Sequence, residues 1–189
     1  MLAPAVDQPS IRARMHPISV ETYHRLGETG QIGERTELIR GIIIDQMAKS
    51  PLHSSIVQRL DRHLLRILPP GWHPRAEQPL TFSDSEPEPD VAAVQGEIDD
   101  YENAHPTTAA LIIEVCVTSE DLDRVKLALY AEAGVSEVWL VLAEERILER
   151  HTEPQGAAYR RLERAAFPET LESTVFPGLV LPPAGLFPG

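Results

Sequence analysis

The sequence predicts an α/β (α+β) fold in which helices flank a mixed β-sheet, and two patterns indicate it. Residues 111–117 (LIIEVCV) are apolar at six of seven positions, which is typical of a strand covered on both faces of a sheet. A helical segment and the apolar strand 138–142 follow, so this part of the chain has the order of a β-α-β unit. Earlier β-rich segments have the short connections of hairpin or meander partners, which makes the sheet mixed.

The chain before residue 50 is expected to form an arm, a short helix and a hairpin. Residues 1–16 show no periodicity and indicate a disordered arm. Ser19 is a suitable N-cap for a helix that runs to about Glu28. Residues 36–47 (TELIRGIIIDQM) are rich in β-branched residues and interrupted by Gly41, which predicts a tight hairpin or a kinked strand.

Residues 52–68 form the clearest helix in the sequence. Apolar residues recur at helical spacing, Pro51 suits the first turn, and Pro69 and Pro70 end the helix. The opposite face carries Arg59, Arg62, His63 and Arg66. Such a stripe is usually a solvated surface, and contact with nucleic acid is the alternative.

The remaining elements follow from apolar runs and turn residues. Residues 72–82 have the pattern of a strand, and Asp90 opens a second strand, VAAV. Ser119 is expected to cap a helix to about Ala133, with an apolar stripe of Leu122, Val125, Leu129 and Ala133. Residues 146–151 and 159–163 alternate like an outer hairpin, and the proline-rich C-terminal segment is expected to be irregular.

Composition limits the class of protein without naming a function. The 189 residues carry a formal net charge of −12, which argues against a protein that coats nucleic acid non-specifically. One cysteine, Cys116, excludes an internal disulfide and a multi-cysteine zinc site. No apolar run reaches the ~18 residues of a membrane span, and no secretory signal is apparent. We therefore expect a cytoplasmic protein with no membrane association.

Two carboxylates carry the strongest functional signal. Glu114 lies within the buried strand, where a charge needs a cationic partner, a metal ion or a raised pKa. Asp90 follows Pro89 and stands at the start of its strand. Carboxylates at these two strand positions can converge on one hard cation such as Mg²⁺, which we favour for Glu114 over the alternative of a buried structural ion pair with Arg or Lys.

Other polar residues are weaker candidates. Lys126 borders the apolar stripe of its helix and either extends to solvent or points back toward Glu114 to stabilise phosphate charge. Glu37 is a third acidic group or a salt-bridge partner, and His53 either binds phosphate or carries protons, or is a surface histidine. Cys116 has the apolar context of an inert thiol, while helix capping or solvent exposure explains Asp123.

Five segments taken in order resemble one known family: ERTELIRGIII, MAKSPLHSSIVQRL, EQPLTFSDSEPEPDVAAV, LIIEVCV and KLALYAEAGVSEVWLVL. They are similar to the Uma-type restriction endonuclease family of the PD-(D/E)xK nuclease superfamily. The resemblance covers about residues 17–187, and residues 89–142 are its most specific part. It implies a restriction-endonuclease-like domain that hydrolyses DNA phosphodiester bonds with a divalent metal, Mg²⁺ or Mn²⁺.

The resemblance also implies roles for individual residues. Asp90 and Glu114 correspond to the metal ligands, and Lys126 replaces the superfamily lysine, whose usual position here is Cys116. Glu37 matches an acidic residue that completes the site, and His53 and Gln78 fall at family positions near the substrate. The segment between Glu114 and Lys126 is about one residue shorter than the family pattern.

Three hypotheses remain open on the sequence alone. The first is a metal-dependent endonuclease acting on DNA, which we expect to be a homodimer with Arg59 and Arg62 on the substrate side. The second is a catalytically inactive nuclease-fold module that binds nucleic acid or a protein partner, which the negative charge favours. The third is hydrolysis of another phosphate ester, since fold does not fix the substrate.

Overall fold

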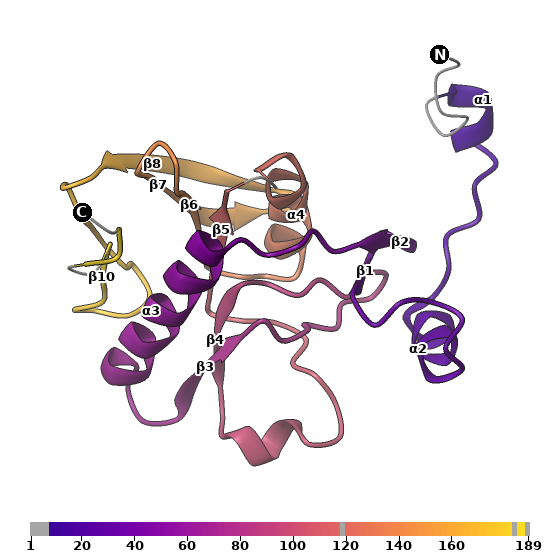
Figure 1. The fold of residues 1–189 in the computed structure, drawn as a ribbon, viewed down its shortest axis with the longest axis horizontal. Coiled ribbons are helices and arrows are strands. Elements are labelled where there is room, and N and C mark those ends of the chain that lie inside the picture. Colours follow the sequence, from indigo (N-terminus) through magenta and orange to yellow (C-terminus); the bar gives the residue numbers. More distant parts are fainter. Residues whose placement is uncertain (1–7, 118–119, 183–184, 188–189) are drawn as a thin grey trace. The chain divides into compact units, whose positions relative to one another are not determined.

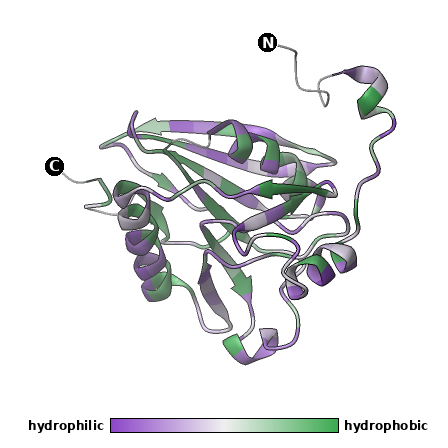
Figure 2. Cartoon of the chain, turned by 45° about the vertical axis from the view of Figure 1, so that its right-hand side comes forward, coloured by the Kyte–Doolittle hydropathy of each residue, from purple (hydrophilic) through white to green (hydrophobic). Residues whose placement is uncertain are grey.

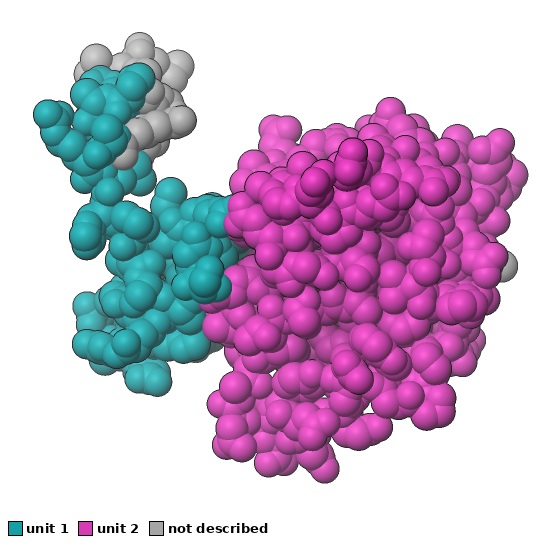
Figure 3. Space-filling model, turned by 180° about the vertical axis from the view of Figure 1, so that it is seen from behind, with its two compact units in different colours: residues 1–46, 83–85 teal, residues 47–82, 86–189 magenta. Residues whose placement is uncertain are grey.

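The computed structural model describes residues 8–117, 120–182 and 185–187, and it divides into two compact units (Figure 3). The smaller unit comprises residues 1–46 and 83–85, and the larger one comprises residues 47–82 and 86–189. Asp90 and Glu114, the residues with the strongest functional signal, belong to the larger unit.

The smaller unit contains helices α1 (Pro9–Arg12) and α2 (Val20–Glu28) and the antiparallel strands β1 (Thr36–Ile39) and β2 (Ile42–Asp45). Ser19 caps α2 as predicted, because its hydroxyl oxygen accepts a hydrogen bond from the Thr22 N–H. Arg40 and Gly41 form the turn of the hairpin, with φ of 53° and 73°. Positive φ at both central residues is typical of a two-residue hairpin turn, so the segment is a tight hairpin rather than a kinked strand.

The larger unit is built on a six-stranded sheet of order β3-β4-β5-β6-β7-β8. The strands are β3 (Trp72–Ala76), β4 (Val91–Gln95), β5 (Leu111–Cys116), β6 (Glu137–Leu142), β7 (Ile147–Gln155) and β8 (Ala158–Ala166). β5 and β6 are parallel, and the other neighbours are antiparallel. The sheet is therefore mixed, and the parallel pair is the predicted β-α-β unit. A 3₁₀ helix, η2 (Ile98–Tyr101), follows β4.

Helices α3 (Pro51–Ile67) and α4 (Glu120–Glu132) belong to different hydrophobic clusters (Figure 1). Ile113 and Val115 of β5 cluster with Ile56 of α3, whereas Ile112 clusters with Tyr130 of α4. Residues of one strand thus alternate between two faces, each covered by one helix, as the period of a β-strand requires. Figure 2 shows α3 with hydrophobic residues along one side and hydrophilic residues along the other. No helix in the described ranges is long and apolar enough to cross a membrane.

The boundaries of α3 agree with the prediction, but two other elements differ from it. The Ser50 hydroxyl caps α3 at the His53 N–H, and Pro51 occupies its first turn. β3 ends at Ala76 instead of continuing to residue 82, because Glu77 adopts φ of 55° and turns the chain. The C-terminal segment is not wholly irregular, since β10 (Val180–Leu181) pairs with β9 (Leu171–Glu172).

The buried face of α4 agrees only in part with the predicted apolar stripe, because Leu129 is buried but Val125 is not. Val125 is 56% exposed, whereas Asp123 and Lys126 are each 4% exposed. The helix places its charged residues against β5, where Glu114 supplies a partner for Lys126. Of the two alternatives for Lys126, the structure shows the one that points back toward Glu114, whereas the solvent exposure expected for Asp123 is wrong. The expected cap at Ser119 lies outside the described residues.

Candidate active site

Asp90 and Glu114 lie opposite each other at one end of the sheet. β4 and β5 are antiparallel, and Val91 lies opposite Ile113. Asp90, which precedes β4, therefore faces Glu114, which follows Ile113. The Asp90 N–H donates to Glu114 Oε2 at 3.1 Å, and the Val115 N–H donates to Asp90 Oδ2 at 2.7 Å. The side chains of Asp90 and Glu114 thus accept hydrogen bonds from backbone N–H groups just beyond the last residue pair of β4 and β5. These hydrogen bonds hold both carboxylates in fixed orientations.

Three side chains of α4 surround Glu114 on its face of the sheet. The Tyr130 hydroxyl donates to Glu114 Oε1 at 2.5 Å. The Lys126 Nζ lies 3.6 Å from the same oxygen and 3.9 Å from Asp123 Oδ1. Lys126 and Tyr130 are spaced one helical turn apart, so both reach the residue that faces α4 from the centre of β5. The structure thus brings together Asp90, Glu114 and Lys126.

Burial dominates the electrostatics of this cluster. Burial raises the pKa of Glu114 from its ordinary value to about 8, opposed by Lys126 and Tyr130 and assisted by Asp123 and Asp90. The carboxyl therefore binds a proton near neutral pH even with the ammonium of Lys126 beside it. Burial, together with the nearby carboxylates, also raises the pKa of Cys116, which keeps this thiol protonated and agrees with the interpretation of an inert cysteine.

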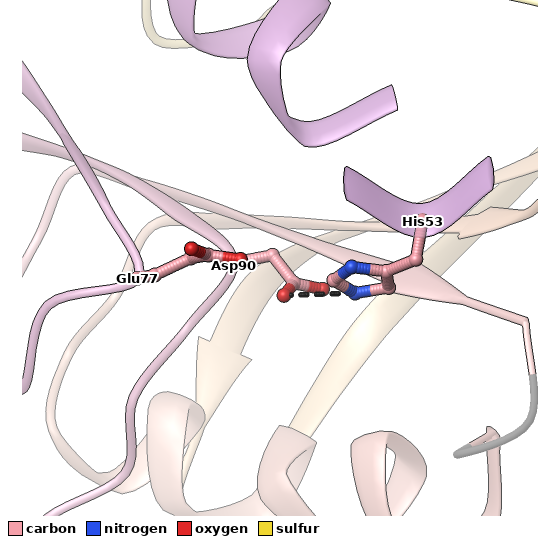
Figure 4. A group of neighbouring side chains, drawn as sticks. All are labelled: His53, Glu77 and Asp90. Atoms are coloured by element: carbon pink, nitrogen blue, oxygen red, sulfur yellow. Dashed lines mark ion pairs between the residues drawn. The ribbon is translucent and has the colours of Figure 1, made fainter. Parts of the chain in front are cut away.

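His53 and Glu77 approach Asp90 from two further elements (Figure 4). His53 lies in the first turn of α3, and its Nε2 is 3.0 Å from Asp90 Oδ1. Burial lowers the pKa of His53, but the hydrogen bond and charge of Asp90 outweigh it, so the pKa is raised. The His53 Nδ1 is buried and has no hydrogen-bond partner among the described residues. This imidazole has unused bonding capacity beside a carboxylate.

Glu77 is a candidate metal ligand that the sequence analysis missed. Its N–H donates to the Asp90 carbonyl oxygen at 3.1 Å, which holds the two residues side by side. One donor atom each from His53, Glu77 and Asp90 lie within 4.8 Å of one another. One sequence feature could have identified Glu77: it stands at the end of a β-rich segment, immediately before Gln78. The family resemblance pointed to Gln78 instead.

Gln78 and Glu37 are not among the residues that the larger unit gathers around Asp90. Gln78 is exposed and accepts a hydrogen bond from Arg75 Nη2 at 3.3 Å. Glu37 is buried in β1 of the smaller unit, whereas the cluster around Asp90 belongs to the larger unit. The sheet of the larger unit therefore does not supply Glu37.

The basic stripe of α3 is not simply a solvated surface. Arg59 Nη1 donates to the carbonyl oxygens of Gly185 and Leu186, and His63 Nε2 lies 3.1 Å from the Val180 carbonyl oxygen. Arg62 and Arg66 join these residues around an open hollow of about 690 Å³ between α3 and the C-terminal segment. Arg59 is exposed, as the solvated-face interpretation expects, and it also contacts the protein's own backbone.

The donor set around Asp90 fits a divalent cation. Two carboxylates and an imidazole lie together, and carboxylate oxygen and imidazole nitrogen are common ligands of first-row divalent ions. The buried ammonium of Lys126 lies on the far side of Glu114 and adds a fixed positive charge. Such a combination suits binding and cleavage of a phosphate ester.

Comparison with known proteins identifies the family. A family model described as "Uma2: Putative restriction endonuclease" matches residues 20–184. The chain belongs to this family. A crystal structure titled as a putative nuclease belonging to DUF820, from Anabaena variabilis ATCC 29413, is similar in fold with a TM-score of 0.63 and 19% identity, covering 83% of this chain and 89% of that one. Among curated proteins, a sequence search finds no match. Membership of the Uma2 family supports a nuclease function in general terms.

Proposed function

We propose that this protein is a divalent-metal-dependent endonuclease that hydrolyses phosphodiester bonds of DNA. The observation that carries the proposal is the meeting of Asp90, Glu114 and Lys126 at one end of the sheet, linked by contacts of 3.1 and 3.6 Å. Membership of a family described as restriction endonucleases supports the same reaction class. Asp90 and Glu114 hold Mg²⁺ or Mn²⁺ in this proposal.

The ion, when bound, acidifies water and neutralises charge on the scissile phosphate. Asp90 presents a carboxylate whose orientation is fixed by the Val115 N–H. Lys126 keeps a positive charge where negative charge develops on the phosphate, in a buried environment that strengthens the interaction. Tyr130 donates to Glu114 and favours its charged form, which a cation ligand requires.

Plasmid nicking with Mg²⁺ or Mn²⁺ tests this proposal. We expect Asp90→Asn, Glu114→Gln and Lys126→Met to reduce cleavage by about 10²-fold or more, because each removes an interaction at the reacting phosphate. Asp121→Asn is the matched control, since Asp121 is exposed on the same helix as Lys126. Circular dichroism of every variant verifies that the fold is retained.

The possible outcomes separate the three hypotheses. Loss of cleavage in the three variants but not in the control supports the endonuclease. DNA binding without cleavage in either metal, unchanged by Glu114→Gln, indicates an inactive nuclease-fold module. Hydrolysis of small phosphodiesters without strand scission indicates another phosphate ester as substrate.

We also propose that the enzyme is a cytoplasmic homodimer, since two such sites allow both strands of a duplex to be cut in one encounter. Light scattering tests the assembly directly. A mass near 42 kDa, about twice the 21.0 kDa of one chain, supports the dimer, and a mass near that of one chain refutes it.

A further inference from the structure

We propose that His53 and Glu77 are metal ligands together with Asp90, and that the imidazole makes the site select Mn²⁺ over Mg²⁺. The inference rests on the proposed function in that the ion is the one used for cleavage. The inference adds His53 and Glu77 as ligands beside Asp90, and it adds a preference for Mn²⁺ over Mg²⁺. Neither statement follows from the Asp90–Glu114 pair.

The separations of the donor atoms suit one ion. Two ligands at about 2.1 Å from a six-coordinate ion lie about 3.0 Å apart when adjacent and about 4.2 Å apart when opposite. His53 Nε2 and Asp90 Oδ1 are 3.0 Å apart, the separation of adjacent ligands. All three donor atoms lie within 4.8 Å of one another, so a shift of less than 1 Å brings Glu77 into range.

The backbone holds the three residues in place before any ion binds. Asp90 is fixed through Val115 and Glu114, and Glu77 is tied to the Asp90 carbonyl oxygen at 3.1 Å. His53 lies in the first turn of α3, which Ser50 caps. Figure 4 shows Asp90 between His53, which comes from the helix, and Glu77, which comes from the opposite side.

Charge also favours this set. Asp90 and Glu77 supply two negative charges for a divalent ion, and the imidazole binds as a neutral ligand. Lys49 contacts Glu77 at 2.9 Å and also lies 3.7 Å from Glu88. Lys49 therefore keeps a carboxylate partner when Glu77 turns to the ion.

Glu114 is less available than Glu77 as a ligand. Its Oε2 accepts the Asp90 N–H, and its Oε1 accepts the Tyr130 hydroxyl and lies near Lys126. Glu77 is 38% exposed at its side chain and makes a surface ion pair, which costs little to exchange. Glu77 therefore turns to the ion at a lower cost than Glu114, and both carboxylates remain ligands in this proposal.

The nitrogen ligand decides the choice of metal. Mg²⁺ strongly prefers an all-oxygen environment and gives up its waters reluctantly, whereas Mn²⁺ accepts imidazole and lies above Mg²⁺ in affinity for nitrogen donors. We expect the protein to bind Mn²⁺ at least about tenfold more tightly than Mg²⁺. Replacing the imidazole of His53 by an oxygen donor should reduce the difference between the affinities for Mn²⁺ and Mg²⁺.

The experiment is a Mn²⁺ titration of the full chain without DNA, followed by electron paramagnetic resonance, with Mg²⁺ as competitor. His53→Asn and Glu77→Gln should each weaken Mn²⁺ binding about tenfold or more, and His53→Asn should reduce the preference for Mn²⁺. His63→Asn, on the same helix, and Glu88→Gln, which removes the same charge beside Lys49, are the matched controls and should change affinity by less than about twofold.

The result distinguishes this inference from the proposed function. Unchanged Mn²⁺ binding in both His53→Asn and Glu77→Gln, with loss in Glu114→Gln, overturns the inference and leaves the nuclease proposal intact. Equal affinity for Mn²⁺ and Mg²⁺ overturns the selectivity. Mn²⁺ binding with the expected pattern but no cleavage of DNA supports the inference and refutes the endonuclease. Glu77 is at the surface, so Glu77→Gln remains informative if His53→Asn fails to fold.

Discussion

Replacing Lys126 by methionine removes a buried cation while keeping the length of the side chain. Lys126 is 4% exposed, and its Nζ lies 3.6 Å from Glu114 and 3.9 Å from Asp123. The substitution leaves two buried carboxylates without the ammonium between them. We therefore expect a large loss of stability in addition to the loss of activity.

The distances set the magnitude. At an effective dielectric constant of about 20, unit charges separated by these distances attract by about 4–5 kcal/mol for each pair. Methionine avoids the cost of burying an ammonium, which offsets part of this loss. Removal of one partner from a buried ion pair destabilises proteins by about 3–5 kcal/mol. Because the pKa of Glu114 is about 8, this carboxyl is mostly ionised only above that pH, so we expect Lys126→Met to reach this range at pH 9 and to cost less at pH 7.

The loss of stability caused by Lys126→Met should be larger at alkaline pH than at neutral pH. The pKa of Glu114 is raised from 4.5 to about 8 in the folded protein, chiefly by burial, so the folded state holds this proton to a higher pH than the unfolded state. This carboxyl therefore lowers stability as the pH rises from 4.5 to 8. Without Lys126 the folded pKa rises further, and the loss continues above pH 8 by about 1.4 kcal/mol per pH unit.

Urea unfolding at pH 7 and pH 9, followed by the fluorescence of buried Trp139, measures both effects. Lys49→Met is the matched control, since Lys49 is paired with Glu77 near the surface, where an ion pair contributes about 0–1 kcal/mol. If Lys126→Met costs no more than Lys49→Met, or if its cost is the same at both pH values, the argument from burial is wrong.

Three further predictions concern other parts of the structure. Tyr130→Phe removes the hydrogen bond to Glu114 and should weaken metal binding by about 10- to 100-fold with the fold retained, as calorimetric titration of Mn²⁺ can verify. Arg124→Met removes two hydrogen bonds, of 2.9 and 3.0 Å, to buried Glu149. Burial by itself would raise the pKa of Glu149, but the hydrogen bond and charge of Arg124 outweigh burial, so the pKa is lowered in the folded protein. The ion pair therefore stabilises the fold at pH values above the pKa that Glu149 has in the unfolded chain. This contribution is lost as the pH falls through the pKa of Glu149 in the folded protein. Urea unfolding should therefore show a larger cost of Arg124→Met at pH 7 than at pH 3, and equal costs would contradict the assignment. Gly41→Ala should destabilise the smaller unit by at least about 1 kcal/mol, because φ is +73° at this position and an added Cβ would clash with the Cβ of Pro17. Hydrogen exchange of the β1–β2 hairpin measures this loss of stability.

Much of the architecture could be predicted from local patterns. The apolar run of residues 111–117 identified a strand covered on both faces, and Pro51 and Pro69 fixed the length of α3. These signals are local, because a strand or a helix requires a periodic pattern and suitable ends within a few residues. The same reasoning placed Asp90 and Glu114 at strand positions that the structure brings together.

The rotation of α4 could not be predicted in the same way. Its apolar residues suggested a face containing Val125, but that residue is exposed and Lys126 is buried. Helical periodicity assigns charged residues to solvent unless a partner on another element is known. Here the partner is Glu114, whose position opposite α4 depends on how the helix packs on the sheet.

The sequence by itself determined the strands, the main helices, the family pattern and the two carboxylates, which meet where the pairing of β4 with β5 ends. Only the tertiary structure decided which other side chains join them. Glu77 reaches Asp90 because a positive φ ends β3 there, and His53 reaches it because α3 begins beside the sheet. Sequence patterns report the environment along one element, whereas a site is made by side chains from several elements, and their meeting depends on packing between those elements.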